Sequence, residues 1–239
     1  MQLDLLPTRT GSAAENMAVD FLLLQRYPTQ THARFRHYDW HRPSFTFGYS
    51  QPLAFVHAQL PAGETVELCR RPTGGGVVDH REDWTYALVI PHNHSLHEER
   101  ATESYRLVHA CIAESLNQLG EPAVLQPPAE KKASDPAGCG PGVCFTKAEP
   151  FDVIHPQTLA KIAGAAQKRS RQGLLFQGSI ARKAVSPQLD WETFETLLTA
   201  RLAQVLGWPA TTCAWPELSE DEISALTEQY SSAAWNAFR

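Results

Sequence analysis

A run that is apolar on both faces of an extended chain places the strongest constraint on the fold. The run is WTYALVI, residues 84–90, and its side chains alternate between two faces of a sheet without leaving either face to water. We expect Pro91 to end the strand, because proline lacks the N–H that a ladder needs. The run therefore predicts a strand deep within a sheet.

Helical and strand patterns surround this run in an irregular order. Ser12 and Glu15 form a capping box for a helix over residues 13–26, and further helices are expected at 101–119, after Asp190 as far as Gly207, and after Ser219. Strands are expected at 33–37, 44–48, 65–69, 151–154, 161–167 and 174–180. The order predicts an α/β protein of the α+β type, with mixed β-sheets flanked by helices rather than a regular βαβ array.

Composition and charge argue against several classes of protein. The 239 residues are 43% hydrophobic and 20% charged, which suits a packed core, and no stretch approaches the roughly 20 apolar residues of a membrane span. The net charge of −5 argues against a nucleic-acid partner. The start, MQLDLLPTRTGS, lacks a basic region followed by an apolar run, so we expect no secretory signal. We expect a soluble, cytoplasmic protein without a membrane partner.

The cysteines are read as reduced thiols. Their number is odd and their spacing irregular, at positions 69, 111, 139, 144 and 213. Cys139 and Cys144 resemble half of a zinc site, but such a site commonly needs a second pair of ligands. The histidines of HNHSLH, residues 92–97, are more simply a polar loop after a strand. We therefore expect no metal, and no disulfide between Cys139 and Cys144.

The glycine-rich segment RRPTGGGVVDH, residues 70–80, has two interpretations. It is neither a P-loop nor a G-x-G-x-x-G sequence, so it is either a tight turn between strands or a wall where backbone approaches a ligand. Arg70, Arg71 and His80 flank the glycines with hydrogen-bond donors. This arrangement suits a flat or linear ligand with a carbonyl or phosphate held at the rim.

Lys161 and Cys144 are the candidate reactive groups. Lys161 precedes small apolar residues, so it either reaches solvent from a strand end or lies beside a space that a ligand fills. Cys144 follows a Pro/Gly-rich stretch and is either a small buried hydrophobe or a nucleophile. A nucleophile needs a nearby cation to stabilise the thiolate, and Lys161 or His80 could supply it.

Several of these segments together carry a family resemblance. They are the ENMAVD start of the first helix, PSFTFGYSQ, RRPTGGGVVDH, Cys144-Phe145 and KIAGAAQKRSRQGLLFQGSI. In this combination the chain resembles the lipoate/biotin protein ligase superfamily, in its lipoate ligase and octanoyltransferase branch. The resemblance fades near residue 185. It implies the mixed-sheet fold of the biotin and lipoate ligase catalytic domains.

The resemblance also implies roles for individual residues. Lys161 stands where the family's lysine contacts the acyl carbonyl, and backbone N–H groups near Gly164 and Ala165 are expected to serve as the oxyanion site. Cys144, followed by Phe145, matches the nucleophile of octanoyltransferases and related amidotransferases, although Thr146-Lys147 replaces the acidic residue that usually follows. The wall of the acyl tunnel is expected to comprise Arg71, Thr73, Gly74, Gly75, Gly76 and His80.

The implied function is transfer of an octanoyl or lipoyl group, through a cysteine thioester, to the lysine of a lipoyl domain. The donor is expected to be octanoyl–acyl carrier protein or a lipoyl protein, and the acceptors the glycine cleavage H protein and the E2 subunits of 2-oxoacid dehydrogenases. No cofactor is required. The alternatives are a lipoate ligase that uses ATP and Mg²⁺, and a non-catalytic acyl-binding homologue. We expect a catalytic domain at residues 1–185 and, packed on it, a helical extension at 186–239 that suffices for only two helices.

Overall fold

The computed structural model describes residues 1–26, 31–128 and 148–237. The helices are α1 (Ala13–Gln25), α2 (Leu53–His57), α3 (Ser95–Glu98), α4 (Ala101–Gln118), α5 (Trp191–Leu206), α6 (Glu220–Ser231) and α7 (Ala233–Asn236), with a 3-10 helix at Arg182–Ala184. The strands are β1 (Leu3–Gly11), β2 (Ala33–Trp40), β3 (Ser44–Phe47), β4 (Glu67–Arg70), β5 (Val77–Asp79), β6 (Asp83–Pro91), β7 (Val124–Leu125), β8 (Val153–Ile154), β9 (Lys161–Arg169), β10 (Gly173–Ala181) and β11 (Ala210–Thr212).

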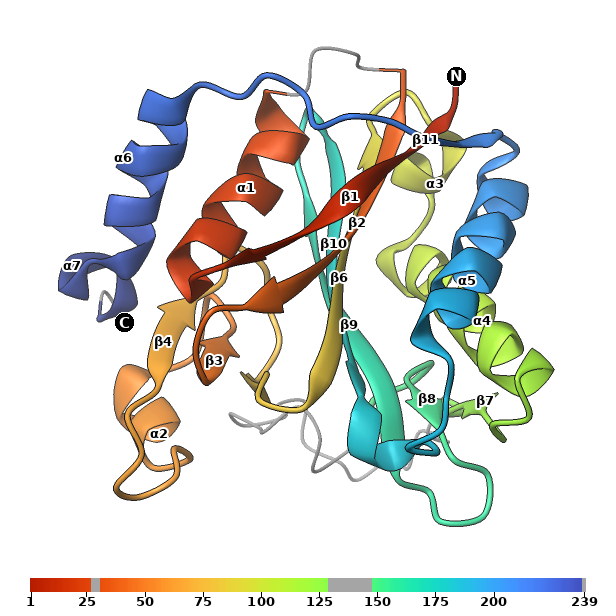
Figure 1. Cartoon of the computed structure of the whole chain (residues 1–239), viewed down its shortest axis with the longest axis horizontal. Helices are drawn as coiled ribbons and strands as arrows, with labels where there is room; N and C mark the ends of the chain where they lie inside the picture. The colour runs from red at the N-terminus through yellow and green to blue at the C-terminus, as the bar shows by residue number, and fades with distance from the viewer. Residues whose placement is uncertain (27–30, 129–147, 238–239) are drawn as a thin grey trace, which may run out of the picture.

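The strands form two mixed sheets. The large sheet has the order β11-β1-β2-β6-β10-β9-β8-β7, and the small sheet has the order β4-β3-β5. Figure 1 shows α1 and α6 on one face of the large sheet and α4 and α5 on the other, with the small sheet below α1. The predicted fold class, mixed sheets flanked by helices, is confirmed.

Strand β6 lies at the centre of the large sheet, as its apolar run predicts. It pairs antiparallel with β2 and with β10. Its alternate residues enter two different clusters: Leu88 and Ile90 pack in the core that includes side chains of α4 and α5, whereas Ala87 and Val89 pack with Val19 and Leu23 of α1. The strand is therefore covered on both faces, and the two helical layers are held together through it.

Local sequence signals set the ends of the long helices. Ser12 caps α1 by accepting from the Glu15 N–H, and the reciprocal Glu15 bond completes the predicted capping box. Asp190 caps α5 in the same way, and Gly207 ends this helix in the left-handed region at φ 66°. The predicted helices 13–26, 101–119 and 191–206 are confirmed to within one residue at each end.

The segment 92–97 differs from its prediction as a polar loop. Residues 95–98 form α3, and the Nδ1 atom of His94 accepts from the Leu96 N–H at the start of this helix. The Nε2 atom of the same ring lies 3.0 Å from the Leu206 carbonyl at the end of α5. The loop prediction is wrong because a buried histidine here caps one helix and contacts the end of another.

The C-terminal part is not only helical, which corrects the expectation of two helices after residue 186. Strand β11 pairs parallel with β1, with Leu3 opposite Ala210, and three helices lie in the described part of this region. Phe194 and Leu198 of α5 belong to the main core, and α6 packs against α1. The boundary at residue 185 stays a prediction.

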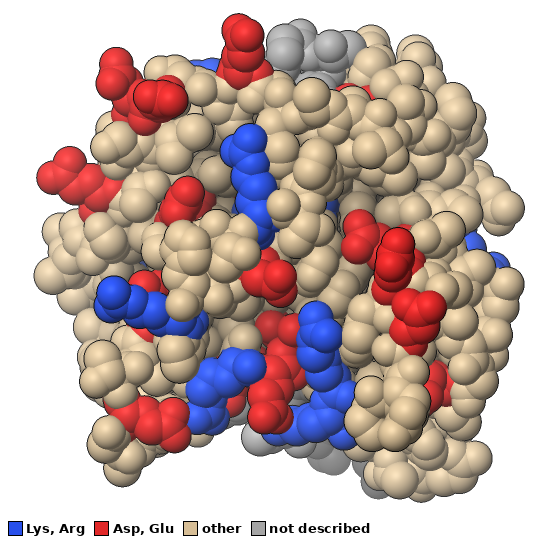
Figure 2. Space-filling view, viewed as in Figure 1, with Lys and Arg blue, Asp and Glu red and all other residues tan. Residues whose placement is uncertain are grey.

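The surface carries both signs of charge. On the face shown in Figure 2, Lys and Arg side chains are interspersed with Asp and Glu, and no broad basic area is visible. Within the residues that the structure describes, no helix combines the length and the apolar character needed to cross a membrane.

Candidate active site

A pocket opens between the large and small sheets. The space between its lining residues, counted out to the open mouth, is about 460 Å³. Strands β2, β6, β9 and β10 line one side. Strands β3 and β5, together with Arg71 in the segment between β4 and β5, line the other. The lining residues are Met17, Tyr38, Thr46, Arg71, Val78, His80, Thr85, Lys161, Gly164, Ala165, Ala166, Gln177, Gly178 and Ser179.

The pocket brings together several predicted site residues that are distant in sequence. Lys161 lines it beside Gly164 and Ala165 from β9, and Arg71 and His80 line it from the other side. The other predicted wall residues, Thr73, Gly74, Gly75 and Gly76, are not among its lining residues. The proposed nucleophile Cys144 lies outside the described residues.

Lys161 is buried and paired with a carboxylate. Its Nζ atom lies 2.7 Å from Oδ2 of Asp152, and the two side chains are 6% and 0% exposed. Asp152 accepts two further hydrogen bonds, from the Tyr105 hydroxyl at 2.6 Å and from the Glu149 N–H at 2.6 Å. Of the two predicted positions for Lys161, the structure has the one beside a pocket, and its partner Asp152 is a residue that sequence reasoning did not select.

The Lys161 side chain lies across the backbone of Gly164. A Cβ atom at position 164 would come within 2.6 Å of both Cε and Nζ of Lys161, closer than real Cβ contacts. Glycine at this position therefore leaves the space through which the ammonium reaches Asp152. This is a close-approach role, and it explains why a strand rich in small residues follows the lysine.

Replacing Gly164 with alanine is expected to displace the ammonium without unfolding the strand. The new methyl group takes the position of the end of the lysine side chain, which can move towards solvent, but Asp152 then loses its cation, so we expect a stability loss of up to about 3–5 kcal/mol. Because misplacement of a reacting group by about 1 Å can cost about 10²-fold in rate, we expect any catalytic step that uses the Lys161 ammonium to slow by about that factor. Thermal unfolding and steady-state kinetics measure the two effects. Wild-type kinetics in this variant would contradict the placement of Lys161.

One predicted oxyanion donor has another acceptor. The Ala165 N–H donates to the Tyr105 hydroxyl at 3.0 Å, and that hydroxyl donates in turn to Asp152. In this structure the Ala165 N–H therefore supports the Lys161 partner, and its role towards a substrate oxygen stays a prediction. Burial and the Asp152 charge raise the pKa of Tyr105 well above its ordinary value, so the hydroxyl keeps its proton.

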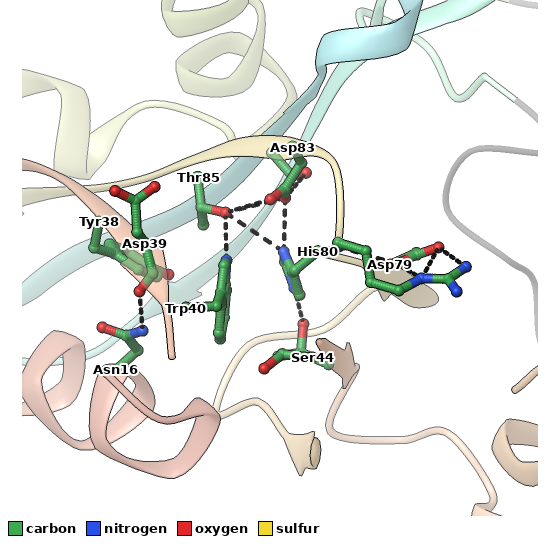
Figure 3. A network of polar contacts seen from close by, with 12 residues as sticks. Asn16, Tyr38, Asp39, Trp40, Ser44, Asp79, His80, Asp83 and Thr85 are labelled. Carbon is green, nitrogen blue, oxygen red and sulfur yellow. Dashed lines mark hydrogen bonds and ion pairs between the residues drawn. The ribbon is translucent and has the colours of Figure 1, made fainter. Parts of the chain in front are cut away.

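A network of polar contacts holds His80 at the pocket wall (Figure 3). Its Nδ1 atom lies 2.7 Å from Asp83 Oδ2, and its Nε2 atom lies 2.6 Å from the Thr46 hydroxyl. The ring stacks on Trp40 at a centroid distance of 4.2 Å. Asp83 also accepts from the hydroxyls of Thr85 and Ser179. Both ring nitrogens of His80 are thus engaged within the protein, as the Lys161 ammonium is by Asp152.

The arginines before the triple glycine bind the protein's own carbonyls. Arg71 donates to the Thr46 hydroxyl at 2.7 Å and to the carbonyls of Gly74 and Gly76 at 2.9 Å each. Arg70 is fully buried and donates to three backbone carbonyls, those of residues 49, 51 and 236. The prediction that these arginines offer donors to a ligand at the rim is therefore wrong for Arg70. Arg71 lines the pocket and also holds the glycine loop, residues 71–76, in place.

The glycine loop passes unusually close to the end of β3. A Cβ atom at Gly48 would lie 2.0 Å from the Gly75 carbonyl oxygen, and Gly75 itself has φ 87°. The Tyr49 N–H donates to the Thr73 carbonyl at 2.8 Å. These contacts support the tight-turn interpretation of the glycines, because they serve backbone packing between the loop and β3.

A buried network behind the pocket connects the glycine loop to α1. The Thr73 hydroxyl donates to Gln177 at 2.8 Å, and Gln177 donates to Asp20 at 2.7 Å. Asp20 also forms a fully buried ion pair with Arg36 at 2.7 Å and accepts from the Tyr38 hydroxyl. Sequence reasoning missed these roles, although Asp20 and Gln177 lie inside the segments ENMAVD and QGSI.

The described residues give no separate metal centre. Among them, no group of three or more His, Cys, Asp or Glu side chains is placed to hold a metal ion. Cys139 and Cys144, considered above as half of a zinc site, lie outside the described residues.

The sequence also matches a known family model, that of the lipoyl protein ligase A/B catalytic domain, over residues 12–202. The chain belongs to this family. The matched region includes every pocket residue and continues through most of α5, beyond the predicted domain boundary at residue 185.

Curated relatives share this region. Octanoyltransferase LipM of Kyrpidia tusciae is 32% identical over 178 residues, which cover 74% of this chain and 64% of the relative. Octanoyltransferase LipM of Geobacillus kaustophilus is 30% identical over 170 residues, which cover 70% of this chain and 60% of the relative. The chain thus spans less than two thirds of the length of these relatives.

Solved structures share the fold. A lipoate-protein ligase A bound with ATP superposes with a TM-score of 0.73 at 19% identity, covering 99% of both chains. A putative lipoate protein ligase from Thermoplasma acidophilum with bound lipoic acid gives a TM-score of 0.70, also at 19% identity, over the whole of both chains. At this identity the likeness establishes the lipoate-ligase fold that the sequence motifs predict.

Proposed function

We propose that this chain is an acyltransferase that moves an octanoyl group to the lysine of a lipoyl domain through a thioester on Cys144. The observation that carries the proposal is the identity of about 30% to curated octanoyltransferases over 70–74% of the chain. The pocket supports it, because the ammonium of Lys161 and the small apolar side chains of Ala165 and Ala166 line one cavity. An acyl thioester presents the matching chemistry, a polar carbonyl at the head of an apolar chain.

The proposed reaction has two steps. The Cys144 thiolate attacks the thioester carbonyl of octanoyl–acyl carrier protein, and the carrier leaves as a thiol after gaining a proton. The amine of the acceptor lysine then attacks the new thioester, loses a proton and releases the Cys144 thiolate. The Lys161 ammonium stabilises the negative charge that develops on the carbonyl oxygen in each step.

The other parts of this proposal follow from the same chemistry. A thioester donor is already activated, so we propose that no cofactor is required. ATP and Mg²⁺ enter only if the chain is a ligase. The proposed acceptors are the glycine cleavage H protein and the E2 subunits of 2-oxoacid dehydrogenases, and the proposed location is the cytoplasm.

The intact mass of the protein after incubation with octanoyl–acyl carrier protein, without ATP, tests the proposal. We expect a gain of one octanoyl group that is abolished in Cys144→Ala and retained in Cys213→Ala, a matched change at a half-buried cysteine. Burial raises the pKa of both Cys69 and Cys111 to about 12, so neither thiol competes as a nucleophile at neutral pH.

Two other results would replace the proposal with one of the alternatives. If no adduct forms, but a lipoyl domain is modified when ATP and free lipoate are added, the chain is a lipoate ligase. If octanoate binds and no acceptor is modified under either condition, the chain is a non-catalytic acyl-binding protein.

A further inference from the structure

We infer that Asp152 and Tyr105 are positioning residues that hold the Lys161 ammonium at the pocket wall. The reaction assigned to this lysine rests on the proposed function, but the hold itself is a property of the fold. Three separate elements supply it: α4 carries Tyr105, β9 carries Lys161, and Asp152 immediately precedes β8.

The contacts form one continuous chain of hydrogen bonds. The Ala165 N–H donates to the Tyr105 hydroxyl, which donates to Oδ1 of Asp152. The other carboxylate oxygen, Oδ2, contacts Lys161 Nζ at 2.7 Å and accepts from the Glu149 N–H. Both oxygens of the carboxylate are therefore fixed by protein donors, so the carboxylate has a defined orientation towards the ammonium.

Because the Lys161 side chain is buried, the position of its ammonium depends on this oriented carboxylate. A lysine near a strand end ordinarily extends its ammonium into water, and here the side chain is 6% exposed. The space above Gly164 opens a path for the side chain, and the Asp152 carboxylate supplies the attraction at its end. Without the carboxylate, a buried ammonium loses its compensating charge and is strongly disfavoured. Asp152 thus decides where the ammonium lies, and Gly164 allows it to lie there.

The other groups around Lys161 do not replace this carboxylate. From α4, His109 is fully buried, and burial lowers its pKa to about 4, so the ring is neutral at pH 7. Its Nδ1 atom lies 2.7 Å from the Phe151 carbonyl. Arg71 and His80 line the opposite side of the pocket. Arg71 donates hydrogen bonds to Thr46 and to the glycine loop, and the His80 ring contacts Asp83 and Thr46. Asp152 is therefore the acidic partner that the structure places on Lys161.

Tyr105 acts on Lys161 through Asp152. Its ring packs edge-on against His109 at a centroid distance of 3.9 Å, so Tyr105→Phe keeps this packing and removes only the hydroxyl. The loss leaves Oδ1 of Asp152 without its α4 donor and the Ala165 N–H without its acceptor. We expect a smaller effect from Tyr105→Phe than from Asp152→Asn, because the lysine keeps its carboxylate.

Two readouts on the full-length protein test the inference. The first is octanoyl transfer, for which we expect Asp152→Asn to lower kcat by about 10²-fold with little change in KM, because the variant misplaces a group that acts on the reacting carbonyl. Asp152→Glu is expected to recover part of the loss. Glu114→Gln is the control, since it removes a carboxylate from an exposed ion pair with Arg201 on the same helix as Tyr105.

The second readout does not need transfer activity. An amine-reactive reagent labels the folded protein, and peptide mass spectrometry compares the labelling of Lys161 with that of the exposed Lys183. We expect slow labelling of Lys161 in the wild type and in Glu114→Gln. In Asp152→Asn we expect labelling at least several-fold faster, because the ammonium has lost the carboxylate that holds it in the protein and moves to solvent.

The outcomes separate the inference from the proposed function. Inactive wild-type protein with Lys161 labelling that responds to Asp152→Asn would reject the transferase and support the positioning role. Unchanged kcat and unchanged labelling in Asp152→Asn would overturn the positioning role. If Asp152→Asn does not fold, Tyr105→Phe decides: slower transfer or faster labelling supports the inference, and wild-type values for both overturn it.

Discussion

Replacing Lys161 with methionine is expected to lower kcat/KM for the proposed octanoyl transfer by about 10²–10³-fold, the range found when one donor to a developing oxyanion is removed. Methionine has a similar length and no charge. It therefore fills the space above Gly164 but cannot stabilise negative charge on the carbonyl oxygen of the substrate. The loss should appear mainly in kcat, because the charge on the oxygen develops only in the transition state. Steady-state kinetics with octanoyl–acyl carrier protein measure it.

The same variant has a stability cost that a second substitution should reverse. Lys161→Met leaves the buried Asp152 carboxylate without its cation, a change that typically costs about 3–5 kcal/mol. Adding Asp152→Asn removes that charge, so the double variant should recover much of the lost stability while staying inactive. Denaturant unfolding compares the single and double variants. Near-wild-type transfer in either variant would remove Lys161 from the mechanism.

Replacing Arg36 with methionine is expected to destabilise the protein about as strongly as Lys161→Met. Arg36 is 1% exposed, and its partner Asp20 is fully buried beneath the pocket, so the variant leaves a carboxylate without its cation. We expect a loss of about 3–5 kcal/mol at pH 7. For a chain of this size that corresponds to a fall in Tm of roughly 6–20 °C, at about 2–4 °C per kcal/mol.

The loss should depend on pH in a defined direction. Burial is the main cause that raises the pKa of Asp20, and Arg36 opposes it. A raised pKa means that the folded state holds its proton at pH values where the unfolded state has released it, so stability falls as the pH rises through that interval. Without Arg36 the interval extends upwards, and the variant should be closer to the wild type in stability in mild acid than at neutral pH.

A second substitution distinguishes this explanation from simple loss of packing. Arg36→Met combined with Asp20→Asn removes both charges, so its stability should exceed that of Arg36→Met at pH 7 and should vary less with pH. Thermal unfolding between mildly acidic and neutral pH measures both. If the stability lost in Arg36→Met does not change with pH, the loss comes instead from the packing of the Arg36 side chain against Tyr38.

Elements with strong local signals could be predicted from the sequence. The capping box at Ser12, the Asp190 cap and the uninterrupted apolar run of β6 depend on neighbours a few residues away, so the residues themselves contain the information. Strand β1 was missed for a physical reason. Pro7 interrupts its pattern, and the structure places this proline at the irregularity between Leu6 and Arg9, where the ladder with β2 shifts register.

The candidate site was only partly predictable. Lys161 stood out because a charged residue opened an apolar strand, and the resemblance supplied a role for it. Its partner Asp152 is a single acidic residue in the short strand predicted at 151–154, and nothing in the local pattern shows that it meets Tyr105 of α4, 47 positions earlier. The buried strand arginines follow the same rule. Charged side chains such as those of Arg36 and Arg70 are ordinarily exposed to solvent. Both are buried here, and only their partners in the folded protein make this possible.

The contacts between the two ends of the chain have a consequence for synthesis on the ribosome. Arg70 immediately precedes the glycine loop and forms two hydrogen bonds with Asn236, which lies 166 positions later in the chain. Leu3 of β1 pairs with Ala210 of β11. At about 5–20 residues per second, the nascent chain waits roughly 8–33 seconds between making Arg70 and making Asn236. Strand β1 lacks its β11 partner until residues 210–212 are made, and Arg70 lacks two of its contacts until Asn236 is made. The newly made protein therefore completes the surroundings of its pocket only after residue 236 has been made, long after the residues that line the pocket.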